Sequence, residues 1–339
     1  MKMECVLHRK VTSFDVAELA GVAQPTVSRA LRNLPGASEE TRQRVKAAAE
    51  ELGYIPNASG RALSTHRSRR IAIVSEQLTN PFYPELVEPL SKYLKRNGFH
   101  SVVVTHEIHE DMEANIFADG SFDGVILTTS ERYSSLPRNL TKLGIPHVLV
   151  NRILDEPESP SCSADNYAGA LAVSALIARL GHTKVGSIQG MDVTSTGHER
   201  AAAIRLGMKN RGIELTDDLV RRVTFNHDSG RAAAIELLTQ TDQITAIACG
   251  NDVIAMGVLS AAKQLGYRVP EDLTVVGFDD ITLAGWPLAN LTTVRCDLEM
   301  LAQTAVDLLL SEMQTPGQPS VAKRIPVKLI LRGTHGPVR

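Results

Sequence analysis

The sequence predicts a small all-α head followed by an α/β core of two doubly wound parallel-sheet lobes. Two observations predict this fold. The first 70 residues contain short helical patterns without β-branched runs, and from Ile71 onward continuous apolar runs alternate with helical stretches. Apolar strands separated by helices are typical of a parallel sheet covered on both faces. A chain of 339 residues is long enough for two or three hydrophobic cores, so a disordered protein and a disulfide-stapled miniprotein are both excluded.

The head is expected to contain three helices. Phe14–Ala20 and Thr26–Leu34 predict the first two, with Pro25 near the start of the second, where its missing N–H costs nothing. Ser38 is expected to cap the third helix, and Gly53 to end it. Two short helices joined by a tight glycine-containing turn are typical of a helix-turn-helix motif.

The core strands fall into two sets that meet near Asp165, which predicts two similar lobes. The expected buried strands are Ile71–Val74, Ser101–Val104, Gly124–Leu127 and His147–Val150 in the first set, and Lys184–Ile188, Thr245–Ala248 and Leu273–Val276 in the second. The helices between them end at glycines, which is the expected junction between a helix and a strand. Ligands of such sheets bind beyond the carboxyl ends of the strands, so two facing lobes predict a cleft.

The charge of the chain is unevenly distributed. The formal net charge is −2, but the first 70 residues carry 12 Lys and Arg against 7 Asp and Glu, which leaves 24 against 31 for the rest. The head is therefore +5 and the body −7. A basic module joined to an acidic body favours a nucleic-acid partner for the head.

The remaining composition argues against export, membranes and metals. Cys5, Cys162, Cys249 and Cys296 are far apart and form no CxxC pair, so neither a zinc site nor a disulfide framework is indicated. The first ten residues carry charges where a signal peptide needs an apolar core. No apolar run approaches the roughly 20 residues of a membrane helix. We expect a cytoplasmic protein that contains no metal and no cofactor.

An ordered set of motifs runs through nearly the whole chain. The set comprises Val11–Val22, Thr26–Arg29, Thr41–Arg42, Val45 and Leu52–Asn57 in the head, and Asn80–Phe82, Asp123–Gly124, Asp165–Asn166, Gly181–His182, Asn251–Asp252 and Val276–Asp280 in the body. In this order the motifs resemble the lactose-repressor/galactose-repressor family of transcriptional regulators. The resemblance implies a DNA-binding head, a hinge helix and a two-lobed effector core like that of periplasmic sugar-binding proteins. The expected divisions are 1–60 for the head, 61–70 for the hinge, 71–165 with 296–324 for the N-terminal lobe, and 166–295 with 325–339 for the C-terminal lobe.

The resemblance assigns base reading to Gln24, Pro25 and Arg29. The fork of Arg29 suits the O6/N7 edge of guanine, Gln24 can pair with adenine, and Pro25 offers only apolar contact. Contacts to phosphate are expected from Thr12, Thr26, Ser28 and Asn33. Ala23 stands where the family usually has Ser or Thr, a side chain that caps the helix or contacts a phosphate, so we expect Gln24 to take over that role. The alternative is an ordinary packed pair of helices with a solvated Arg29.

The segment Asn57–Ser64 matches the hinge helix of the family, which enters the minor groove of DNA. Asn57 is expected to contact DNA, and Leu63 falls at the position of the residue that wedges between base steps. Gly60 weakens this helix, so we expect it to fold only on DNA. The alternative is a linker in which Leu63 packs on the head.

The resemblance also assigns an effector site to the cleft. Its expected residues are Phe82, Asn151, Thr196, Arg200, Phe225, Asn251 and Asp279. Arg200 would grip hydroxyls or a carboxylate, Asp279 would accept hydroxyls from the opposite wall, and Phe225 would stack on a sugar ring. Asn151 stands where the family often has Asp, which removes one negative charge. The alternatives are an N-cap for Asn251, a surface ion pair for Arg200 and an ordinary turn at Asp279.

Together these features predict a dimeric, ligand-responsive repressor of carbohydrate or sugar-acid utilisation genes on a pseudo-palindromic operator. The effector would be a sugar, a sugar acid or a sugar phosphate. One alternative is a regulator that a purine or another small molecule co-represses, and another is a sugar-binding protein without DNA function. An enzyme is disfavoured because no GxGxxG, P-loop, GxSxG or HExxH motif occurs. Only eight residues follow the strand expected at 326–331, which leaves no room for a tetramerising leucine tail.

Overall fold

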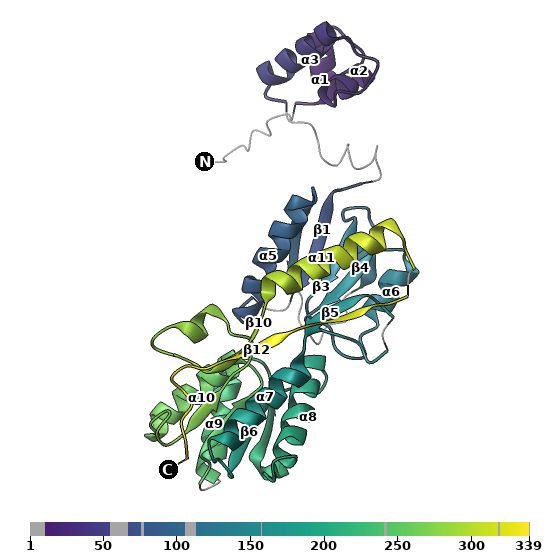
Figure 1. The fold of residues 1–339 in the computed structure, drawn as a ribbon. Coiled ribbons are helices and arrows are strands. Elements are labelled where there is room, and N and C mark those ends of the chain that lie inside the picture. The colour runs from purple at the N-terminus through teal and green to yellow at the C-terminus, as the bar shows by residue number, and fades with distance from the viewer. Residues whose placement is uncertain are drawn as a thin grey trace, which may run out of the picture. The chain divides into compact units, whose positions relative to one another are not determined.

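The computed structural model describes residues 11–54, 67–75, 78–105, 113–156, 158–240, 243–317 and 319–338. The chain divides into two compact units, Met1–Ser68 and Arg69–Arg339. The first is the all-α head and the second is the α/β core (Figure 1).

Within residues 11–54, the head forms the three helices α1 (Ser13–Ala20), α2 (Gln24–Leu31) and α3 (Glu39–Glu51). They pack around Val16, Val27, Ala30 and Val45, of which none is more than 1% exposed. The structure confirms the predicted cap of the third helix, because the Ser38 hydroxyl accepts a hydrogen bond from the Thr41 amide at 3.2 Å.

The second helix of the head differs in its bounds from the prediction. It begins at Gln24 and ends at Leu31, whereas the sequence pattern predicted Thr26–Leu34. Asn33 has a left-handed backbone with a φ of 53°, which an α-helix does not continue through. The apolar periodicity of the segment does not reveal this local change of conformation.

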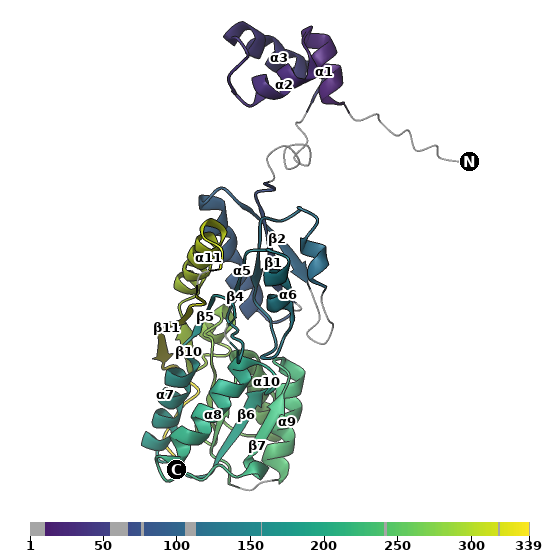
Figure 2. The same ribbon diagram turned by 90° about the vertical axis from the view of Figure 1, so that its right-hand side faces the viewer.

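The N-terminal lobe of the core is built on one six-stranded sheet with the order β11-β5-β4-β3-β1-β2. Its strands are β1 (Arg70–Ser75), β2 (His100–Thr105), β3 (Gly124–Leu127), β4 (His147–Val150), β5 (Ser161–Ala164) and β11 (Ala322–Ile325), and all the pairs are parallel. The helices are α5 (Phe82–Arg96), η1 (Ala114–Phe117), α6 (Leu136–Lys142) and α11 (Leu298–Gln314). Ile71 and Ile73 face the core under α5 and α11, and Ala72 and Val74 face the core under α6 (Figure 2).

The strand predicted as buried at Ser101–Val104 is instead an exposed edge. β2 pairs only with β1 and ends the sheet, and its residues Val102 and Val103 are 37% and 38% exposed. The apolar run resembles a central strand, but its place in the strand order decides its burial.

The C-terminal lobe has a four-stranded parallel sheet with the order β7-β6-β8-β9. Its strands are β6 (Val185–Gly190), β7 (Val220–Val223), β8 (Ala246–Cys249) and β9 (Thr274–Val276), and short η2 (Asp217–Leu219) and η3 (Thr282–Gly285) follow α8 and β9. Helices α7 (Asn166–Arg179) and α8 (Ser195–Lys209) cover one face, and α9 (His227–Gln240) and α10 (Asp252–Leu265) the other (Figure 2). The five predicted junction glycines, Gly98, Gly144, Gly181, Gly212 and Gly266, all have φ values between 69° and 88°.

The chain passes between the lobes three times. It crosses from β5 to α7, from β10 (Thr293–Cys296) to α11, and from β11 to β12 (Val327–Ile330). β10 and β12 form a separate antiparallel pair. The loops that follow β4 in one lobe and β7, β8 and β9 in the other line one cavity.

A close helix crossing in the C-terminal lobe gives a test of the packing. A Cβ at Gly257 in α10 would lie 2.3 Å from the carbonyl oxygen of His227 and 2.6 Å from the amide nitrogen of Arg231 in α9. We expect Gly257→Ala to push the two helices apart and lower the free energy of unfolding by about 1–3 kcal/mol, measured by urea unfolding.

The matched control is Lys263→Ala, an exposed position on the same helix. We expect it to change the free energy of unfolding by less than about 0.5 kcal/mol. Equal losses in the two variants would contradict the packing argument.

Candidate functional site

The head exposes one face of α2. Val27 and Ala30 are buried against the other two helices, whereas Pro25, Ser28 and Arg29 are exposed. Thr26 lies half-buried between them. The exposed set combines a cationic fork, a hydroxyl and an apolar ring, which suit the edges of base pairs and the phosphates of DNA.

Gln24 does not act as the cap that we expected. Helix α2 begins after Ala23 without a side-chain cap. The Gln24 amide Nε2 instead donates to the Ser13 hydroxyl at 3.0 Å, which ties the start of α2 to the start of α1. The prediction that Gln24 caps α2 is therefore wrong, because its side-chain amide bonds to the Ser13 hydroxyl and makes no hydrogen bond to the first backbone amides of α2.

Two of the expected phosphate contacts lie at helix ends. Thr12 is the N-cap of α1 and forms a capping box with Asp15, to which its hydroxyl donates at 2.7 Å. Asn33 is exposed just after α2. The Arg29 side chain runs beside Gly36, with its Cδ 3.7 Å from the place of a Cβ at that glycine. The expected contacts Asn57 and Leu63 lie outside the described residues.

The core has a cavity between its lobes that gathers all seven expected effector residues. Its lining comprises Asn80, Phe82, Tyr83, Asn151, Arg152, Thr196, Arg200, Phe225, Asn251 and Asp279. Asn151 and Arg152 follow β4, Phe225 follows β7, Asn251 follows β8 and Asp279 follows β9. The site therefore forms where parallel strands end, as the topology predicts.

Arg200 is the centre of the C-terminal wall. Its Nε donates to Asn166 at 2.8 Å, its Nη1 donates to the Gly250 carbonyl at 2.7 Å, and its Nη2 lies 3.0 Å from Asp279 Oδ1. The guanidinium carbon is 3.7 Å from the centre of the Phe278 ring. Arg200 is 3% exposed, so it forms a buried ion pair and not the surface pair of the alternative interpretation.

We expect Asp279 on the wall opposite Arg200, but the structure places it beside Arg200 on the same wall. Both residues belong to the C-terminal lobe, where strand ends of one sheet meet. Burial raises the pKa of Asp279, and the Arg200 guanidinium opposes that rise. Asp279 has a φ of 117°, an uncommon conformation for a residue with a side chain, so it is not an ordinary turn.

Asn251 is the N-cap of α10, as one of its two interpretations predicts, and it also lines the cavity. Its Oδ1 accepts the Ile254 amide at 2.9 Å. The next residue, Asp252, is fully buried and accepts the Ile281 amide at 2.9 Å and the Thr293 hydroxyl. Asp252 therefore holds the loop that carries Asp279.

Arg152 lines the cavity as well, although the sequence pattern does not indicate it. It is 2% exposed, and its guanidinium donates to the hydroxyls of Thr196 and Tyr83, the latter at 3.0 Å. The guanidinium carbon lies 5.6 Å from the centre of the Phe225 ring. The available signal was its position directly after Asn151 at the end of a strand.

The lobes contact each other around this cavity. These contacts include Asn80 to the Phe225 carbonyl, the Arg132 amide to the Val193 carbonyl, the Ile153 amide to the Ser195 hydroxyl, and the Thr282 amide to Glu85. The cavity volume is about 10 Å³, which holds no more than one water. A ligand as large as a sugar enters only when the lobes separate or the lining side chains move.

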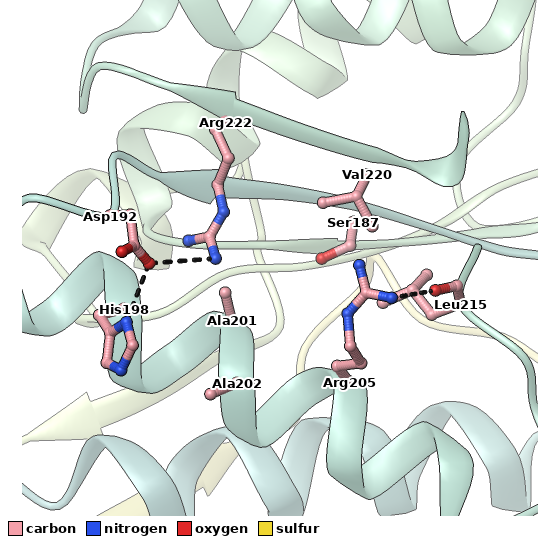
Figure 3. Close-up of a pocket in the computed structure, with 9 residues that line it drawn as sticks. All are labelled: Ser187, Asp192, His198, Ala201, Ala202, Arg205, Leu215, Val220 and Arg222. Carbon is pink, nitrogen blue, oxygen red and sulfur yellow. Dashed lines mark hydrogen bonds and ion pairs between the residues drawn. The ribbon is translucent and has the colours of Figure 1, made fainter. Parts of the chain in front are cut away.

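A second cavity of about 130 Å³ lies between α8 and β7 of the C-terminal lobe (Figure 3). Its lining comprises Ser187, Asp192, His198, Ala201, Ala202, Arg205, Leu215, Val220 and Arg222. Asp192 contacts His198 at 2.9 Å, Arg222 at 3.6 Å and Arg132 of the other lobe at 3.1 Å. Arg205 pairs with Asp217. The charged groups here already have protein partners, and none of the predicted residues lines this cavity.

Nothing in the described part of the chain indicates a metal or a membrane span. Its residues contain no cluster of His, Cys, Asp and Glu that could hold a metal ion. The three described cysteines are buried and unpaired, and burial raises the pKa of the Cys162 and Cys296 thiols to about 12. Within the described ranges, no helix is both long and apolar enough to cross a membrane.

Asp252 gives a pH-dependence prediction. Burial, together with the neighbouring Asp279, raises its pKa well above the ordinary value. A raised pKa in the folded state stabilises the protein at low pH, and this stabilisation is lost as the pH rises through the folded-state pKa. Asp252→Asn stays neutral, so we expect its stability relative to the unsubstituted protein to increase between about pH 5 and about pH 8, measured by thermal unfolding.

The control for this prediction is Asp307→Asn, an exposed position on α11. We expect the stability of this variant to follow that of the unsubstituted protein at every pH. A constant difference between Asp252→Asn and the unsubstituted protein across the range would refute the prediction.

Comparisons with known proteins agree with both parts of the chain. Residues 14–57 match the model of bacterial regulatory proteins of the lacI family, and residues 175–335 match that of a periplasmic binding protein-like domain. The transcriptional regulator CelR of Thermobifida fusca is 32% identical, with 98% of each chain covered. The transcriptional repressor CytR of Escherichia coli K12 is 31% identical, covering 95% of this chain and 96% of its own.

Two solved structures show the same architecture. A lac repressor dimer bound to operator and an anti-inducer superimposes with a TM-score of 0.85 at 26% identity, covering 96% of this chain and 99% of the other. A CelR–cellobiose complex superimposes with a TM-score of 0.74 at 30% identity, covering 96% of this chain and all of the other. The predicted fold of a helical head and two parallel-sheet lobes is thereby confirmed.

Proposed function

Because the chain belongs to the lacI family of bacterial regulatory proteins, we propose that it represses carbohydrate or sugar-acid utilisation genes in response to a small-molecule effector. It is a DNA-binding transcriptional regulator, and we assign it no catalytic residue. The observation that carries the proposal is that all seven expected effector residues line one cavity, in the same chain as an exposed helix face that carries Arg29. Such a regulator acts in the cytoplasm, where the DNA is.

The head supplies the proposed DNA contacts. Arg29 reads a guanine edge from the exposed face of α2, and Pro25 contacts an apolar base edge. Thr26 and Ser28 face the phosphates from the same helix. Gln24 serves chiefly to join α1 and α2, because its amide is engaged by Ser13.

The core supplies the proposed response to the effector. The CelR relative was solved with cellobiose, and we propose a sugar or a sugar derivative for this cleft. Arg200 and Asp279 offer donors and acceptors to vicinal hydroxyls, and Phe225 offers an aromatic face. The ligand separates the closed lobes, and residues 61–70 transmit this change to the head as the hinge. We propose that Asn57 and Leu63 enter the minor groove there.

Two experiments test this function together. Gel-shift measurements with genomic fragments at moderate salt should show sequence-selective binding. A thermal-shift screen of sugars, sugar acids, sugar phosphates and nucleobases should show stabilisation by a tight ligand, which should then change the gel shift. Absence of selective DNA binding would refute the proposed regulatory function. Stabilisation by nucleobases alone would show that the effector is a purine and not a sugar.

Arg29→Ala should lose discrimination at one operator position, because it removes the only exposed cation of α2. We expect a cost of about 1–3 kcal/mol on the cognate sequence, measured by binding to single-base operator variants. The control Arg231→Ala removes the same charge from the core and should leave DNA binding unchanged. Equal weakening on every sequence would make Arg29 a phosphate contact.

We also expect a dimer in solution. A head with one short recognition helix makes few base contacts, so two heads on a pseudo-palindrome are needed for useful affinity. The lac repressor relative was solved as a dimer on its operator. Light scattering should give twice the mass of the 36.7 kDa chain, and a monomer or tetramer mass would contradict the proposal.

A further inference from the structure

The effector cavity contains more positive than negative charge. Among its ten lining residues, two are arginines and one is a carboxylate. That carboxylate, Asp279, is already paired with Arg200 at 3.0 Å. Arg152 therefore has no ion pair of its own, although its charge also acts on Asp279 from beyond ion-pair distance.

The groups in direct contact with Arg152 are neutral. Two hydroxyls, those of Thr196 and Tyr83, accept hydrogen bonds from its terminal nitrogens, and its third neighbour is the Phe225 ring. Its Nε is buried and has no hydrogen-bond partner. Within the described ranges, no carboxylate oxygen lies within 4.0 Å of the guanidinium. Burying the Arg152 guanidinium, which is 2% exposed, without an ion pair lowers the free energy of unfolding.

The acidic residues nearby are engaged elsewhere. Glu85 accepts the Thr282 amide at 3.0 Å, and Asp280 pairs with Arg295 and Arg332. The pKa of Asp252 is raised well above its ordinary value by burial, which favours its neutral form. Asn151, beside Arg152, is neutral where the family often has Asp. The lining thus carries one more positive than negative charge, because Arg152 and Arg200 share the single carboxylate of Asp279.

We propose that the effector carries an anionic group, a carboxylate or a phosphate ester, which pairs with the Arg152 guanidinium. This inference rests on the proposed effector function of the cleft. The planar fork of an arginine binds either group with two parallel hydrogen bonds. The anion takes the place of the Thr196 and Tyr83 hydroxyls, while Arg200 and Asp279 hold the hydroxyls of the ligand.

The first test compares charged ligands with their neutral parent on the full-length protein. The probes are D-gluconate and D-glucuronate for the carboxylates, D-glucose 6-phosphate for the phosphate ester, and D-glucose as the neutral control. We expect at least one anion at saturating concentration to raise the Tm by about 3 °C or more, with no shift from glucose. Arg152→Met should abolish that shift. An equal shift from glucose, or a shift retained in Arg152→Met, would overturn the proposal.

The second test needs no ligand and decides the outcome when none of the probes binds. Arg152→Met removes an uncompensated charge, so we expect its Tm to equal or exceed that of the unsubstituted protein. The matched control Arg200→Met leaves Asp279 unpaired and should lower the Tm. If Arg152→Met lowers the Tm as Arg200→Met does, Arg152 has a structural role and the proposal fails.

A parallel gel shift separates this inference from the proposed function. If the unsubstituted protein shows no sequence-selective DNA binding, the proposed regulatory function fails, whereas the result of the ligand test at Arg152 still stands. Selective DNA binding together with a response to neutral sugars alone would keep the regulator and overturn the anionic effector.

Discussion

The buried ion pair between Arg200 and Asp279 is the interaction on which the effector cleft depends. Arg200 projects from α8 and joins the start of α7 through Asn166, the end of β8 through Gly250, and the end of β9 through Asp279. Removing either charge leaves the other buried and uncompensated, which typically costs about 3–5 kcal/mol. Asp279, which has a backbone φ of 117°, lines the cavity beside Arg200.

The opposite wall depends on a second buried arginine with a different role. Arg152 belongs to the N-terminal lobe, and its bond to the Thr196 hydroxyl of the C-terminal lobe joins the two walls. If an anion binds Arg152 as proposed, it displaces the Thr196 hydroxyl and removes this contact between the lobes, which would couple ligand recognition to lobe separation at one side chain.

Much of the site could be predicted from the sequence because its residues occupy fixed places in a repeated βα pattern. Phe225, Asn251 and Asp279 each follow the end of a strand within a few residues, so the topology brings them to one edge. Arg152 was missed because an arginine after an apolar strand usually faces solvent, and only the packing of the other lobe buries it. The Gln24 cap was mistaken for a similar reason, since the Ser13 hydroxyl comes within reach only when α1 and α2 pack.

The sequence by itself determined the helical head, the alternation of strands and helices, the glycine junctions and most of the cleft residues. These features follow from local backbone preferences and from the periodicity of apolar residues. The tertiary structure alone decided that β2 is an exposed edge, that Arg200 and Asp279 pair on one wall, and that Arg152 is buried among neutral groups. Burial and charge pairing depend on which segments meet in space, and that information is not carried by any one segment of the chain.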